Sequence, residues 1–281
     1  MKHNIVRTIF FFATLLLTLA AVALVVLAIP LAAQTNDKTT TCSLATLKGT
    51  FGFVGQGTIL AQLPGLPAPP VLTAGSGTVT YDGNGNFSVK DTGSINGAIS
   101  PGTATGTYTV NPDCTYSDVL TTTGGPVFRE VGTIIGRGIF QEIHIIDVDP
   151  WFINVLTLRK TPEGGCSQES VKGTYTVFGQ GFLAPPGMST LVPVAHVGIF
   201  TADGQGTFSG EDTIRIANTT VQDTFTAKYT VNPDCTVTDQ IFTAIGEIDE
   251  VGTFTGVGRS QEYHGIITNP GWVVAETAKK Q

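Results

Sequence analysis

Short runs of alternating apolar and polar residues, separated by glycine or proline, fill the chain after its first 33 residues. Alternation with a period of two is typical of strands that bury one face. In the C-terminal part we count eight such runs, over residues 173–178, 194–201, 207–216, 223–231, 236–244, 250–256, 260–268 and 271–277. The N-terminal part has the same pattern, so the sequence predicts an all-β protein.

Two parts of the chain share the same sequence blocks in the same order. The block YTVNPDCT occurs at residues 108–115 and again, letter for letter, at 229–236. Other repeated blocks begin at Cys42 and Cys166, Lys48 and Lys172, Gly55 and Gly179, Asp82 and Asp203, Glu130 and Glu250, and Gln141 and Gln261. We therefore expect two tandem domains, 42–160 and 166–281, joined by a linker at 161–165.

Each domain is predicted to be a small barrel. About eight antiparallel strands in so short a domain fit a closed up-and-down barrel, which has no exposed edge strand and whose interior holds side chains or one small ligand. Two β-sandwiches are the alternative. The segments Asp82–Gly85 and Asp203–Gly206 predict hairpin turns. Asp82–Asn86 also resembles the start of a calcium loop, but Phe87 stands where such a loop needs glycine.

The first 33 residues predict a targeting segment. Lys2 and Arg7 precede a stretch without charge at 8–33, which is typical of an export signal or a membrane anchor. Its length, close to the roughly 20 residues that cross a bilayer, favours a hydrophobic helix that stays as an anchor. Pro30 and the small Ala33 before polar residues favour cleavage after Ala33. In both cases we expect the rest of the chain, beginning with a linker at 34–41, to be exported to the periplasm or the exterior.

Charge and composition exclude some functions. The chain has 15 Lys and Arg against 22 Asp and Glu, a net charge of −7, which argues against nucleic-acid binding because phosphate contacts need a basic surface. We expect contact with a membrane only through residues 8–33, if that segment is not removed. The low charged fraction of 13%, with 34 glycines, favours a turn-rich β protein.

The four cysteines lie two per domain, at Cys42, Cys114, Cys166 and Cys235. Even numbers at repeated positions in an exported chain indicate disulfides. Three pairings are open, and only Cys42–Cys114 with Cys166–Cys235 keeps each repeat self-contained. Buried free thiols are the alternative, and zinc is disfavoured because the chain has no Cys-x-x-Cys pair.

A repeated Glu-x-His motif is the candidate catalytic feature. On a strand, Glu142 and His144 lie on one face, as do Glu262 and His264. A carboxylate beside an imidazole can act as an acid–base pair. Alternatively, each pair only satisfies its own charges at the surface or the barrel rim. Two ligands per domain are too few for a zinc site, so no metal and no other cofactor is expected.

Several repeated motifs carry a resemblance. They are Cys-Ser, Lys-Gly-Thr-Phe/Tyr, Asp-Gly-x-Gly, Tyr-x-Val-x-x-Asp-Cys-Thr and a strand that bears a glutamate. Together they resemble a group of exported bacterial proteins whose domains are similar to the allene oxide cyclase-like β-barrel. The resemblance covers both repeats, residues 42–279, and implies a fold more than a reaction, because none of the cyclase's catalytic residues matches a position here.

Three functional hypotheses remain open, and the last is a purely structural role in which the barrels are solid and function lies only in the loops and the stalk. The first is an exported, non-enzymatic module that binds a small apolar ligand or an envelope protein. The second is a barrel isomerase or cyclase that uses the Glu-x-His pairs, and it requires these side chains to point into a cavity. No nucleophile elbow, metalloprotease motif, P-loop or dinucleotide fingerprint is present. A proline-rich insert at 63–70 is expected to form an exposed loop that covers a barrel mouth or touches a partner.

Overall fold

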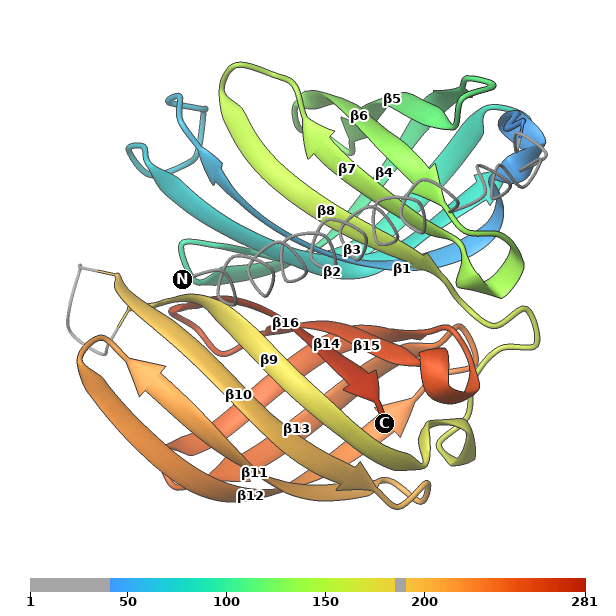
Figure 1. Cartoon of the computed structure of the whole chain (residues 1–281). Helices are drawn as coiled ribbons and strands as arrows, with labels where there is room; N and C mark the ends of the chain where they lie inside the picture. Colours follow the sequence, from blue (N-terminus) through green and yellow to red (C-terminus); the bar gives the residue numbers. More distant parts are fainter. Residues whose placement is uncertain (1–40, 185–190) are drawn as a thin grey trace, which may run out of the picture. The chain divides into compact units, whose positions relative to one another are not determined.

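The computed structural model describes residues 41–184 and 191–281, which form one compact unit of two closed antiparallel β-barrels. In each barrel, strands that are neighbours in sequence are also neighbours in the sheet, as the two rings of arrows in Figure 1 show. The predicted all-β fold with eight strands per barrel is confirmed, and the sandwich alternative is not what forms. The predicted targeting segment, residues 1–33, and the linker up to residue 40 lie outside the described residues.

The first barrel closes by pairing β1 with β8, through residues 51–59 and 152–160. Alternating side chains of every strand face the interior, because a closed sheet has only an inner and an outer face. Its eight strands are β1 (Lys48–Ile59), β2 (Val71–Asp82), β3 (Asn86–Ile95), β4 (Ala98–Val110), β5 (Thr115–Thr122), β6 (Val127–Ile135), β7 (Glu142–Asp147) and β8 (Phe152–Lys160).

The second barrel repeats this arrangement and closes by pairing β9 with β16. Its strands are β9 (Gly173–Leu183), β10 (Val192–Ala202), β11 (Thr207–Ile216), β12 (Thr219–Val231), β13 (Thr236–Thr243), β14 (Gly246–Thr255), β15 (Glu262–Ile267) and β16 (Trp272–Lys280). Four one-turn 3₁₀ helices complete the described structure: η1 (Leu44–Thr46), η2 (Gly138–Phe140), η3 (Glu169–Val171) and η4 (Gly258–Ser260). None of the helices within 41–184 and 191–281 is long and apolar enough to cross a bilayer.

The disulfides join Cys42 to Cys114 and Cys166 to Cys235, as the repeat predicts. Each one ties the segment before the first strand of a barrel to the turn between its fourth and fifth strands. Disulfides of this kind are typical of proteins in an oxidising compartment.

The residues that follow Cys42 close one end of the first barrel. Leu47 is fully buried, and the Tyr108 hydroxyl donates to the carbonyl oxygens of Leu44 and Leu47 at 3.0 and 2.9 Å. Gln141 adds a bond from its Nε2 to the Thr46 carbonyl at 3.1 Å. The η1 segment therefore acts as a floor, and a ligand can reach the interior only from the opposite end.

The predicted hairpin turns are also confirmed. Asp82 Oδ1 accepts hydrogen bonds from the backbone N–H groups of Asn84 and Asn86 at 2.6 and 3.0 Å. Asp203 does the same in the second barrel for Gln205 and Thr207. The aspartates cap turns of their own backbone.

The barrels pack against each other through strands β1–β3 of the first and β14–β16 of the second. Ala74, Ile266 and Val273 form a small buried cluster there. Ser76 Oγ donates to the carbonyl of His264 at 2.8 Å, and Thr253 Oγ1 donates to that of Gly77 at 3.1 Å. The outer face of β14–β16 is therefore covered in this chain.

Candidate functional site

Three carboxyl side chains occupy equivalent inward-facing positions in each barrel. In the first barrel they come from β3, β5 and β6, and in the second from β11, β13 and β14. They are Asp91, Asp118 and Glu130 in the first barrel, and Asp212, Asp239 and Glu250 in the second. Charged side chains are seldom buried without a partner, so their repetition inside two apolar barrels marks them as the candidate site.

The first barrel contains a cavity of about 950 Å³. This volume lies in the range typical of sites for small organic molecules. Its wall is largely apolar and aromatic, and the residues that line it include no lysine, arginine or histidine. Leu63, Pro64 and Leu66 of the proline-rich insert contribute to the lining, so the insert lies at the mouth, one of the two places the sequence allowed.

Asp118 and Glu130 face each other across β5 and β6. Both residues are buried, with 6% and 8% of their surface exposed. The Tyr116 hydroxyl donates to Asp118 Oδ2 and lies 3.1 Å from the hydroxyl of Tyr81. Asp118 Oδ1 is buried and has no hydrogen-bond partner within the described residues, and the same holds for Asp239 Oδ1 at the equivalent position of the second barrel. A polar group of a ligand would satisfy Asp118 Oδ1.

The environment favours the protonated form of these acids. Burial raises the pKa of Asp118 to about 6, and the hydrogen bond from Tyr116 works against this rise. Burial also raises the pKa of Glu130 well above its usual value, and the charges of Asp118 and Asp147 raise it further. At neutral pH the pair therefore carries about one negative charge instead of two.

Asp91 is the third acid of the first cavity, and burial raises its pKa as well. Its carboxyl group lies against the backbone of Gly102, where a Cβ atom would come within 2.2 Å of Oδ1. The missing side chain at Gly102 is what allows Asp91 to turn along the cavity wall. Gly75 also lines the cavity, and a Cβ built there would meet nothing closer than 3.9 Å.

Aromatic residues form both ends of the cavity. Tyr81 packs edge-on against Tyr108 at 5.0 Å and against Phe51 at 5.5 Å between ring centroids, above the closed end. Near the mouth, Trp151 stacks on Phe152 at 5.8 Å. Trp151 lies just before β8, whereas Trp272 begins β16, so the two tryptophans are not equivalent in register.

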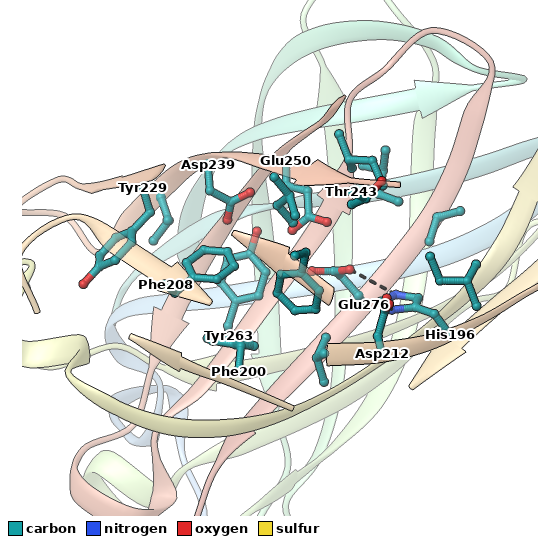
Figure 2. Close-up of a pocket in the computed structure, with 18 of the residues that line it drawn as sticks. His196, Phe200, Phe208, Asp212, Tyr229, Asp239, Thr243, Glu250, Tyr263 and Glu276 are labelled. Carbon is teal, nitrogen blue, oxygen red and sulfur yellow. Dashed lines mark ion pairs between the residues drawn. The ribbon is translucent and has the colours of Figure 1, made fainter. Parts of the chain in front are cut away.

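The second barrel has the same acids but almost no free space, with a cavity of about 70 Å³. Its lumen is occupied by larger side chains at equivalent positions. His196 stands where the first barrel has Gly75, Ile214 replaces Gly93, Phe225 replaces Ala104, Tyr263 replaces Ile143 and Glu276 replaces Leu156. Figure 2 shows His196 joined to Glu276 in this interior, with Asp239 and Glu250 turned toward the same space.

His196 forms an internal ion pair. Its Nε2 lies 3.2 Å from Glu276 Oε2, and its Nδ1 lies 3.9 Å from Asp212 Oδ2. Burial alone would lower the pKa of His196, but the hydrogen bond and charge of Glu276 outweigh it and raise the pKa. Burial would likewise raise the pKa of Glu276, and His196 lowers it on balance. Both shifts favour the charged forms of this pair, a protonated imidazole beside a carboxylate.

The environment of the other two acids beside this pair favours their protonated, neutral form. Burial raises the pKa of Glu250 and of Asp239 well above their usual values, and the Glu276 charge adds to both shifts. They face each other across β13 and β14, as Asp118 and Glu130 do across β5 and β6. The same carboxyl pair is thus built into both barrels.

The Glu-x-His pairs lie on the outer faces of the barrels. In the first barrel, Ile143 and Ile145 point inward, and His144 Nε2 lies 2.8 Å from Glu142 Oε1 on the exposed side. In the second barrel, Tyr263 points inward. The cyclase hypothesis requires the pairs to line a cavity, and this placement does not meet that condition.

Barrel packing covers the second Glu-x-His pair. His264 is 1% exposed, and its Nε2 lies 3.4 Å from Glu262 Oε2. Arg159 of the first barrel forms an ion pair with Glu262, and its Nε lies 3.6 Å from Glu142 Oε2. Burial would raise the pKa of Glu262, but the hydrogen bonds from His264 and Arg159 hold it at about 2. These residues contribute to barrel packing.

Sequence reasoning singled out Glu130 and Glu250 only as parts of repeated blocks and missed the aspartates opposite them. A signal was present, because Asp118 and Asp239 each follow the second cysteine of their repeat by four residues. The register of the hairpins pairs Asp118 with Glu130 and Asp239 with Glu250, and directly paired residues lie on the same face of the sheet. Within 41–184 and 191–281, no group of three or more His, Cys, Asp or Glu is arranged to hold a metal ion.

A scan against protein-family models finds no match for this chain, and a search of curated proteins finds none.

Proposed function

We propose that this protein is an exported binding module and that its first barrel holds one small, largely apolar ligand. The observation that carries the proposal is the cavity of about 950 Å³ in a barrel whose twin is filled. Side chains of the second barrel show that the same fold can pack solid. Gly75, Gly93 and Ala104 instead keep the first interior open.

The wall chemistry supports an apolar ligand with one polar end. Aromatic rings near the mouth and above the floor offer large apolar contact areas. Asp91, Asp118 and Glu130 provide the few polar groups that fix orientation in such sites. An empty apolar cavity of this size costs stability, and a ligand that fills it returns part of that loss.

Binding of the neutral dye Nile red to the full-length, disulfide-intact protein tests the proposal. We expect a saturable rise in fluorescence with one dye per chain. Ala104→Phe copies Phe225 of the second barrel into the first cavity and is expected to weaken dye binding by about tenfold or more. Thr105→Phe changes the next residue of β4, which is exposed on the outer face, and should leave binding unchanged.

No saturable binding, or equal binding by Ala104→Phe and the unchanged protein, would contradict the proposal. Native mass spectrometry of the protein from its own exported fraction adds an independent readout. Extra mass on the disulfide-intact chain would reveal the natural ligand, and the chain mass itself would show whether residues 1–33 are removed.

A further inference from the structure

The second barrel contains an organic cation of its own, and the first barrel lacks one. His196 places an imidazole ring 3.2 Å from Glu276 and 3.9 Å from Asp212, and these acids favour its protonated form. At the equivalent position the first barrel has Gly75, with open space in front of its Cα atom. The shared carboxyl groups are present in both barrels, but only the second supplies a positive partner from its own sequence.

What distinguishes the acids of the first barrel is the lack of a basic side chain among the residues that line their cavity, because Asp239 Oδ1 of the second barrel also has no hydrogen-bond partner within the described residues. Asp118 is 6% exposed, and its Oδ1 atom likewise has none. None of the side chains that line the cavity carries a positive charge. Buried carboxyl groups without a cation are costly, and a ligand that brings one would regain much of that cost.

We propose that the ligand of the first barrel is an organic amine, whose protonated nitrogen occupies the space beside Gly75 and faces Asp91, Asp118 and Glu130. This inference rests on the proposed function, because it names the class of ligand for the same cavity. The apolar body of the amine packs on the aromatic wall toward Trp151 and Phe152, which also offer ring faces near the mouth.

The first cavity lacks one acid that the second barrel has, and this difference restricts the kind of amine that fits. Glu276, the closest partner of His196, is replaced by Leu156 in the first barrel. The amine therefore depends on the three shared acids, and Leu156 adds apolar surface where the second barrel has a carboxylate. This favours an amine with a larger apolar body over a compact, strongly hydrated cation.

Two probes of the same size test the class of ligand. The first is 2-phenylethylamine, and the second is 2-phenylethanol, which lacks the charge. Calorimetric titration of the full-length protein at pH 7.5 should show the amine binding at least about tenfold more tightly. The combined change Asp118→Asn with Glu130→Gln should reduce this preference to about twofold or less, whereas the same change at Asp239 and Glu250 should preserve it.

A second variant tests the comparison directly. Gly75→His with Leu156→Glu transfers the ion pair of the second barrel into the first and is expected to abolish amine binding. Thermal melts followed by circular dichroism report whether each variant folds. If the Asp118/Glu130 variant does not fold, the Gly75/Leu156 variant decides, and amine binding that survives in its folded form overturns the inference.

The experiments separate this inference from the proposed function. If Nile red binds but the alcohol binds as tightly as the amine, the inference that the ligand is an amine is wrong, and the proposed apolar binding site still stands. If neither the dye nor either probe binds, the proposed function fails together with the inference.

Discussion

The two barrels have the same fold, and each has an equivalent disulfide and three equivalent inward-facing acids. Their interiors nevertheless differ. The first keeps a cavity of about 950 Å³, and the second fills the same space with side chains that include an ion pair. The difference arises from a few inward-facing positions. The largest chemical change is at the position that holds Gly75 in the first barrel and His196 in the second, because the histidine adds an ion pair to the interior. One copy of a duplicated domain can thus fill its interior with its own side chains while the other copy keeps a cavity.

Breaking the internal ion pair should have the largest effect. His196→Gly leaves Glu276 buried without its positive partner, which typically costs about 3–5 kcal/mol of unfolding free energy. Chemical denaturation measures this loss, and added imidazole should restore part of it by occupying the vacated space. His144→Ala, at a half-exposed histidine on the outer face of the first barrel, should change stability by less than about 0.5 kcal/mol. Equal losses in the two variants would contradict the assignment of His196 as the internal cation.

The disulfides should contribute almost equally to the two barrels. They join cysteines separated by 72 and 69 residues, and the chain-entropy model gives about 4 kcal/mol for loops of this length. We expect Cys42→Ser with Cys114→Ser, and Cys166→Ser with Cys235→Ser, each to lower the unfolding free energy by roughly 2–4 kcal/mol. A much larger loss in the first barrel would show that its open interior makes it depend more on the cross-link.

Arg159 offers a smaller test, at the contact between the barrels. Arg159→Ala removes a partner of the nearly buried Glu262 and should cost about 2 kcal/mol in chemical denaturation. Lys279→Ala removes the other basic partner of Glu262, but Lys279 is 55% exposed and its loss should cost less than about 0.5 kcal/mol. If the two variants lose the same stability, the buried ion pair is not what distinguishes them.

The pH dependence should be the mildest effect. The pKa values of Asp118, Asp147 and Asp212 are raised to about 6, so the folded state holds protons that the unfolded state releases above about pH 4. Stability therefore falls as pH rises from about 4 to about 7 through these three groups, and the more strongly raised pKa values of Glu130, Asp239 and Glu250 extend the fall to higher pH. Differential scanning calorimetry should show the melting temperature falling by about 3–6 °C from pH 5 to pH 8.

Changing one pair of acids at a time assigns this slope to a barrel. Asp118→Asn with Glu130→Gln should flatten part of it, and Asp239→Asn with Glu250→Gln should flatten another part. A melting temperature that rises between pH 5 and pH 8 in the unchanged protein would contradict the raised pKa values.

Much of the fold could be predicted because the sequence patterns that determine it are local or repeated. Alternation and glycine-rich turns predicted the strands, and the two cysteines of each repeat predicted the pairing that keeps it self-contained. The inner face was harder to assign, because Glu142 and His144 alternate with isoleucines, whereas Glu262 and His264 alternate with Tyr263 and glycine. Apolarity therefore gave no common answer for the two copies.

The candidate site was hidden for a related reason. An aspartate on a strand is usually assigned to the solvent side, and Asp118 lies in a run of mostly polar residues, TYSDVLTT. Its burial depends on which register closes the barrel, and that depends on all eight strands together. The size of the cavity is still harder to predict from the sequence, because it depends on how residues from separate strands, such as Gly75 and Ala104, pack in one interior.

The floor that η1 and Leu47 build under the first barrel has a kinetic consequence. A ligand bound as proposed could not pass through this lumen and would leave by the opening through which it entered. Its residence time would then depend on the rim formed by Leu63, Pro64 and Trp151, whereas its affinity would depend on the inward-facing acids. Substitutions at the rim would speed or slow exchange without altering what is recognised.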